Sequence, residues 1–123
     1  MTITRSAALI APNGVYAGIP VFTGSNGVTI ATAGVNVVLR GLTIYGQGGN
    51  FGIFMTKRAR LTVENCLVAN LMYGIVVDTA AIVRVTDTTI RDNVSHGLLL
   101  KSGTRATVSR AAFSGHGDMG IIV

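Results

Sequence analysis

The sequence predicts an all-β protein made of many short strands joined by tight turns. Its 123 residues suit a single domain, and 16 of them are glycine whereas only two are proline. Valine, isoleucine and threonine are frequent, and these β-branched residues favour strands. No stretch repeats apolar residues every 3.6 positions, as an amphipathic helix would. We therefore expect one domain over residues 1–123.

Two motifs recur along the chain and define a repeat. The first is a glycine followed by an apolar residue, any residue and a second apolar residue; it reads "GIFM", "GIVV", "GLLL" and "GIIV". The four glycines are Gly52, Gly74, Gly97 and Gly120, so the spacings in the numbering are 74−52 = 22, 97−74 = 23 and 120−97 = 23. The second motif lies between them as "VVLRGLTI", "LTVENCLV", "VRVTDTTI" and "ATVSRAAF". Each period therefore contains three short strands with apolar pairs on one side.

These strands fit closed coils with three strands per turn better than a flat sheet. Hairpins would need two-residue turns such as Asn-Gly between the strands, and such turns are not placed there. Coils that stack about 4.8 Å apart bring equivalent residues into columns. The predicted columns are uniformly apolar: Ile53, Ile75, Leu98 and Ile121; Met55, Val77, Leu100 and Val123; Leu39, Val63, Val85 and Val108; Ile44, Val68, Ile90 and Phe113. We expect four to five coils, irregular over residues 1–27 and regular over 28–123.

These segments resemble the right-handed parallel β-helix proteins of the pectate-lyase-like type. The resemblance rests on the "GI.V" strands and on "LRGLTI", "LTVENC" and "VTDTTI", and it covers roughly residues 28–123. The earlier "AALIAPNGVYAGIPV" and "NGVTI" are similar to the opening coil of small bacterial members. The resemblance implies a right-handed parallel β-helix. It leaves the function open, because the family includes polysaccharide lyases, glycoside hydrolases, epimerases and adhesins.

Two functions follow as hypotheses: a non-catalytic binding or structural module, and a carbohydrate-active enzyme or a remnant of one. Glycoside hydrolysis needs two carboxylates, and the repeat alignment makes Glu64 and Asp87 diagonal neighbours at one corner, with His116 as a third candidate. Arg40 and Arg110 share that corner. Because a solvated pair of opposite charges is the commoner outcome there, we favour the binding module.

His116 has a functional and a structural interpretation. Its "GHG" is similar to one signature of polygalacturonases, but the neighbouring "TDTTIRDN" has neither Asn-Thr-Asp nor adjacent aspartates, and no Arg-Ile-Lys follows. His116 also lies four residues before its repeat glycine, as Asn70 and Asn93 lie before theirs. We favour a structural ladder of Asn70, Asn93 and His116 that bonds the backbone of successive turns.

The positive charge predicts a basic edge. The sequence contains ten Lys and Arg residues and five Asp and Glu residues, which gives a net charge of +5. "TKRAR" groups three cations, and the repeat brings two more near them; the predicted binding residues are Lys57, Arg58, Arg60, Lys101 and Arg105. A cationic edge of this kind would attract an acidic polysaccharide. The alternative is a charged, soluble loop that discourages the strand edges of two molecules from pairing. The sequence disfavours nucleic acid as a partner, because it has no tryptophan and few aromatic residues.

The sequence favours neither a cofactor nor a metal site. The five acids are spread over different corners, and Cys66 is the single cysteine, predicted to face inward beside Leu42, Thr88 and Ala111. Asp78 and Lys101 are expected to form a surface ion pair. No apolar run approaches the roughly 18 residues of a membrane helix, and "AALIA" is too short for a secretory signal. We expect a soluble protein of undetermined location.

The last repeat predicts self-association. Its coil stops after "GIIV", which would leave Leu98, Leu100, Val108 and Phe113 facing water together with unpaired strand edges. We expect an end-to-end homodimer whose interface contains Phe113, Ile121, Ile122 and Val123.

Overall fold

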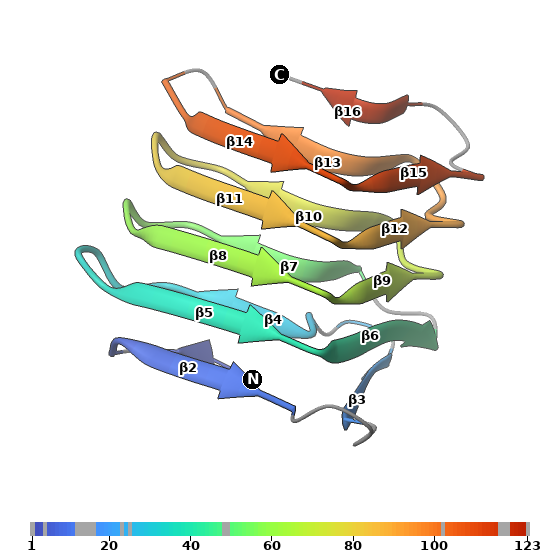
Figure 1. The fold of residues 1–123 in the computed structure, drawn as a ribbon, viewed down its shortest axis with the longest axis horizontal. Helices are drawn as coiled ribbons and strands as arrows, with labels where there is room; N and C mark the ends of the chain where they lie inside the picture. Colours follow the sequence, from blue (N-terminus) through green and yellow to red (C-terminus); the bar gives the residue numbers. More distant parts are fainter. Residues whose placement is uncertain are drawn as a thin grey trace.

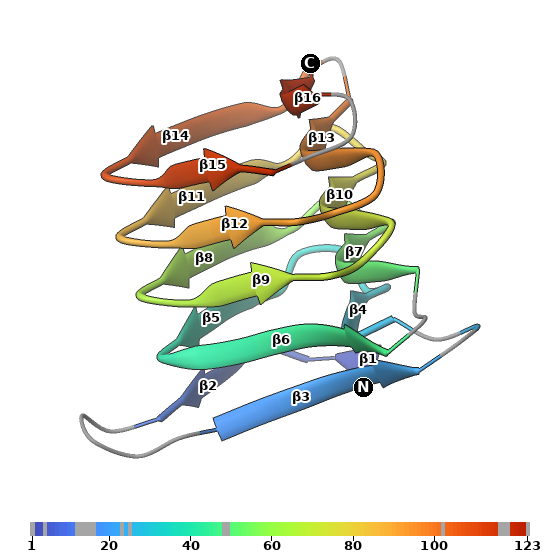
Figure 2. The ribbon, with the colours of Figure 1, turned by 90° about the vertical axis from the view of Figure 1, so that its right-hand side faces the viewer.

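The computed structural model describes residues 2–3, 5–11, 17–22, 24, 26–47, 50–101, 103–115 and 119–122. Over these residues the chain winds upward in coils, and each coil passes through three sheets in the same order (Figures 1 and 2). We name these sheets A, B and C in that order. Each β-strand pairs in parallel with the equivalent strand one coil away, so the predicted all-β architecture of stacked three-strand coils is confirmed.

The strands of each sheet come from successive coils. Sheet A contains β1 (Thr2–Ile3), β4 (Val28–Ile30), β7 (Phe51–Met55), β10 (Tyr73–Val77), β13 (His96–Leu100) and β16 (Met119–Ile122). Sheet B contains β2 (Ala7–Ile10), β5 (Asn36–Arg40), β8 (Arg60–Glu64), β11 (Ile82–Thr86) and β14 (Arg105–Ser109). Sheet C contains β3 (Ala17–Phe22), β6 (Leu42–Gln47), β9 (Leu67–Ala69), β12 (Thr89–Arg91) and β15 (Ala112–Ser114).

The predicted apolar columns supply much of the core. In sheet A, Ile75 pairs with Ile53 below and with Leu98 above, and the same register continues from Leu98 to Ile121. The columns that begin at Leu39 and Ile44 pair as predicted in sheets B and C. Stacking like on like lets each coil bury the apolar face of its neighbours, which is the source of stability in a solenoid.

The upper end of the stack differs from the expectation at two residues. Leu98 and Leu100 are buried rather than exposed to water, and their strand, β13, pairs with β16 through Leu98 and Ile121. Val108, in β14, is 38% exposed. Val123 lies outside the described residues.

The first coil is less regular than the others. Ala7 pairs with Val37, a step of 37−7 = 30 in the numbering, whereas Ala17 pairs with Leu42, a step of 42−17 = 25. From β7 to β10, where Phe51 pairs with Tyr73, the step is 73−51 = 22. The unequal steps mean that the corners of the first coil are longer, while its strands still join all three sheets.

The corner between sheets B and C bends within one residue. Gly41, Asn65, Asp87 and Arg110 occupy equivalent positions there with φ between 49° and 72°. Glycine, asparagine and aspartate tolerate this left-handed conformation better than other residues do. The next residue in each coil then turns inward, so that Cys66 is buried as predicted.

The corner between sheets C and A changes length from coil to coil. Arg91 pairs with Ala69, a step of 91−69 = 22, whereas His96 pairs with Tyr73, a step of 96−73 = 23. The corner after β12 is therefore longer than the corner after β9 by a single residue. Because of this extra residue, the predicted equivalence of Asn70 and Asn93 is wrong, and Asn70 lies opposite Asp92. Asn93 instead accepts a hydrogen bond from the Leu71 amide at 3.0 Å. His116 lies outside the described residues.

Candidate functional site

The corner that holds Glu64 and Asp87 is neutralised by arginines. Nη2 of Arg40 lies 2.6 Å from Oε2 of Glu64. Arg110 binds Asp87 through two contacts, Nε to Oδ1 at 2.6 Å and Nη2 to Oδ2 at 3.1 Å. This two-point contact lowers the pKa of the Asp87 carboxyl below its ordinary value. An acid catalyst needs the opposite shift, so the corner has the paired arrangement expected of a solvated surface.

The other acids of the described chain are also paired. Asp92 lies 2.7 Å from the guanidinium of Arg91, and Asp78 lies 3.8 Å from the ammonium of Lys101, as predicted. Asp118, the fifth acid, lies outside the described residues. Each described acid therefore engages one cation, and four of the ten cations are used in this way.

The remaining six cations share one side of the molecule. They have no acidic partner within 4.0 Å among the described residues. They lie on the strands of sheet B or just before them; we call the exposed outer side of this sheet, with its leading corner, the basic face, and its unpaired cations are Arg5, Lys57, Arg58, Arg60, Arg84 and Arg105.

Three of these arginines form a zigzag over successive coils. Ile82 pairs with Arg60 below and with Arg105 above, so those two arginines share a column. Arg84 stands two residues beyond Ile82 and therefore points to the same side. A strand spacing of about 4.8 Å and a rise of about 3.3 Å per residue put each Cα roughly 8 Å from the next in the zigzag.

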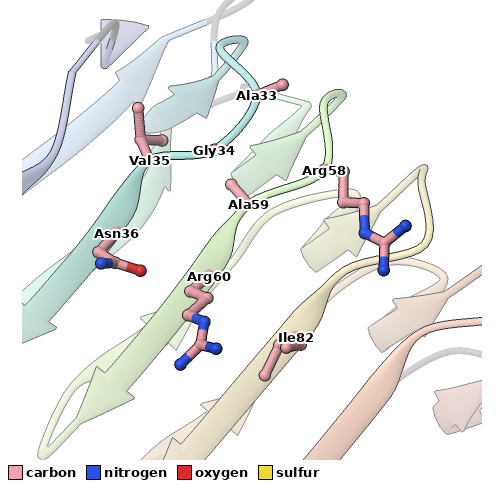
Figure 3. Close-up of a pocket in the computed structure, with 8 residues that line it drawn as sticks. All are labelled: Ala33, Gly34, Val35, Asn36, Arg58, Ala59, Arg60 and Ile82. Carbon is pink, nitrogen blue, oxygen red and sulfur yellow. The ribbon is translucent and has the colours of Figure 1, made fainter.

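The basic face contains a hollow of about 310 Å³ where the chain turns from sheet A into sheet B (Figure 3). Arg58 and Arg60 stand at its rim, and Asn36 adds an amide. Its floor is aliphatic: Val35 and Ala59 show an edge to solvent, and Ile82 is 43% exposed. The residues that complete the lining are Ala33 and Gly34.

Two further depressions continue the hollow across sheet B. The first shares Arg60 and Ile82 with the hollow, and the second shares Arg84 and Thr107 with the first. Their volumes are about 270 and 360 Å³. Together they make a groove that runs from the hollow to the paired corner of Glu64 and Asp87.

A family model for the right-handed beta helix region matches residues 5–123. The chain belongs to this family. A comparison with curated proteins finds no match for this right-handed beta helix protein, and neither does a comparison with solved structures. Family membership agrees with the three parallel sheets described above and accounts for the fold alone.

The predicted binding residues of this right-handed beta helix protein are placed as follows. Arg58 and Arg60 line the hollow, Lys57 precedes them in the same corner, and Arg105 shares the column of Arg60. Lys101 is engaged by Asp78 instead. Sequence reasoning missed Arg84, although the apolar alternation of "IVRVT" places it between two inward valines and hence on the outer side of sheet B.

Other polar chemistry is sparse in the described part of the chain. Burial raises the pKa of the Cys66 thiol, which keeps the sulfur protonated and unreactive at neutral pH. The described residues contain no group of three or more His, Cys, Asp or Glu side chains suited to a metal ion. They also form no helix that is long and apolar enough to cross a membrane.

Proposed function

We propose that this right-handed beta helix protein is a binding module for an acidic polysaccharide, with the basic face as its contact surface. One observation carries the proposal: the six unpaired cations lie together on one side, while the described acids each engage a cation. The resemblance to pectate-lyase-like proteins adds support for a saccharide ligand.

Unpaired arginines bind carboxylates at low cost. An arginine already held by an acid must give up that contact before it binds a ligand, whereas Arg58, Arg60 and Arg84 give up only water. The guanidinium group matches a carboxylate with two parallel hydrogen bonds. The strongest attraction for a polyanion therefore lies at the hollow end of the groove, because the opposite end is already neutralised.

The groove suits a sugar chain better than a nucleic acid. Its lining residues include no aromatic side chain, so bases would find nothing to stack on. Its middle carries the hydroxyls of Thr62, Thr86 and Thr107, which can exchange hydrogen bonds with sugar hydroxyls. The described aromatic contacts occur on sheet A instead, among Phe51, Phe54, Tyr73 and His96. The alternative of a carbohydrate-active enzyme gains no support from Glu64 and Asp87, since both are held by arginines.

Retention on immobilised polygalacturonate tests the proposal. We expect the protein to be retained at low salt and released steeply towards physiological salt, because counterions screen the charges. The double substitution Arg58→Glu and Arg60→Glu should abolish retention. As a matched pair, Arg60→Glu on the basic face and Arg91→Glu on sheet C make the same change in net charge, and Arg91→Glu should weaken retention far less. Equal losses in the two variants, or retention that ignores salt, would refute the proposal.

A further inference from the structure

The hollow has a feature that a purely ionic ligand would not use. Its lining includes the aliphatic residues Val35, Ala59 and Ala33 together with the exposed side chain of Ile82. A single exposed isoleucine is ordinary on a protein surface. Here the isoleucine lines the same hollow as Val35, Ala59 and Ala33, together with two unpaired arginines (Figure 3).

Ile82 interrupts an otherwise polar column. The register of sheet B places it between Arg60 and Arg105, with Asn36 one coil below Arg60. The other three residues of this column are therefore polar, and Ile82 is its apolar residue in the lining of the hollow. The juxtaposition offers a cationic rim and an apolar floor to one ligand group.

We propose that the hollow binds one acidic sugar residue that carries a small acyl ester, such as an O-acetyl group. The carboxylate lies against Arg58 and Arg60, and the acyl methyl packs on Ile82 and Ala59. The volume of about 310 Å³ is at the low end of the range for small-molecule sites, roughly 300–1,000 Å³, and so suits one sugar residue. A methyl ester does not satisfy both parts, because esterifying the carboxylate removes the charge that the arginines bind. This inference rests on the proposed function and names the form of polysaccharide preferred.

A single polymer in two forms tests the inference. Polygalacturonate is lightly O-acetylated, and part of the same batch is then deacetylated in mild alkali, so that chain length and carboxylate content match. We expect the protein to bind the acetylated form about four-fold more tightly in titration calorimetry, the gain expected for burying one methyl group.

Two variants test whether the preference for the acetylated form arises in the hollow. Ile82→Thr keeps a β-branched side chain in β11 and should bind the acetylated and deacetylated forms with equal affinity. Ile10→Thr is the matched control, because Ile10 is 53% exposed, lies in β2 of the same sheet and does not line the hollow. It should keep the four-fold preference. Circular dichroism and thermal unfolding confirm that both variants fold.

The outcomes separate the two proposals. Equal affinity of the unmodified protein for the two forms overturns the acyl-ester inference, while salt-sensitive binding of both forms keeps the proposed function. A preference that survives in Ile82→Thr also overturns the inference, since the hollow would not be its source. Binding of neither form overturns the proposed function and the inference with it.

Discussion

Single residues at the corner between sheets B and C combine an unusual backbone with a specific charge pair. Asp87 and Arg110 both have φ near 50°, and this conformation is costly for arginine, which has a β-carbon and no local hydrogen bond to offset the strain. Arg110 donates two hydrogen bonds to Asp87. The pair belongs to adjacent coils, so it links the two sharp bends directly.

The titration of Asp87 should report this pair. Arg110 lowers the pKa of the Asp87 carboxyl below its ordinary 3.8. Because the folded value is the lower one, the pair stabilises the protein above the ordinary value, and this contribution is lost as the pH falls through the folded value. We expect the NMR titration midpoint of Asp87 to lie below 3.8 and to rise towards it in Arg110→Gln. Arg91→Gln, which disturbs a different pair, should leave it unchanged; a midpoint insensitive to Arg110→Gln would contradict the assignment.

Strands and corners differ in how much of their structure is predictable from the sequence. A strand shows its register through alternation, and because like residues stack on like, the columns through Leu39, Ile44 and Ile53 were predictable from repetition alone. A corner has no such periodicity. One added residue between Arg91 and His96 therefore shifted the predicted partner of Asn70.

The candidate site follows the same rule. The cluster of Arg58 and Arg60 was predictable because the two residues are close in the chain. The hollow was not, since it also needs Ala33, Val35 and Ile82, which meet the arginines only after the corners of successive coils have been closed.

The corner after β12 should depend on Asn93. The side chain is 1% exposed, and its Oδ1 accepts the Leu71 amide of the coil below. Asn93→Ala leaves that buried N–H without an acceptor, which should lower the free energy of unfolding by about 1–3 kcal/mol. Val94→Ala is the control, because Val94 is 71% exposed and should change stability by less than about 0.5 kcal/mol. Denaturant unfolding measures both, and equal stabilities would contradict the role assigned to Asn93.

At the scale of the whole molecule, sheets B and C have strand edges at the upper end of the described stack. β14 and β15 are the last strands of sheets B and C in the described chain, and four of the five residues of β14 are exposed. Strands of this kind leave backbone groups available for pairing. In sheet A, β16 continues the register with Leu98 facing Ile121.

We propose that a second copy of the chain pairs with these strand edges, most simply as a two-fold dimer. The interface would include Phe113 and β16, as the sequence indicated. Light scattering at micromolar concentration should report a dimer, and Val108→Asp should weaken it by placing a charge at the open end. Ile10→Asp puts the same charge in β2, at the opposite end of sheet B, and should leave the dimer intact. A monomer at all concentrations would refute this expectation.

The separation of paired from unpaired charge also gives the molecule an electric dipole. Four acid–cation pairs cancel locally, whereas six cations on one side do not, so the dipole of the described residues points across the coil axis towards sheet B. An anionic layer would exert a torque on such a molecule and turn sheet B towards itself before any contact forms. With a Debye length of about 8 Å at physiological ionic strength, this turning is confined to the last approach, and the protein would meet the layer lying on its side.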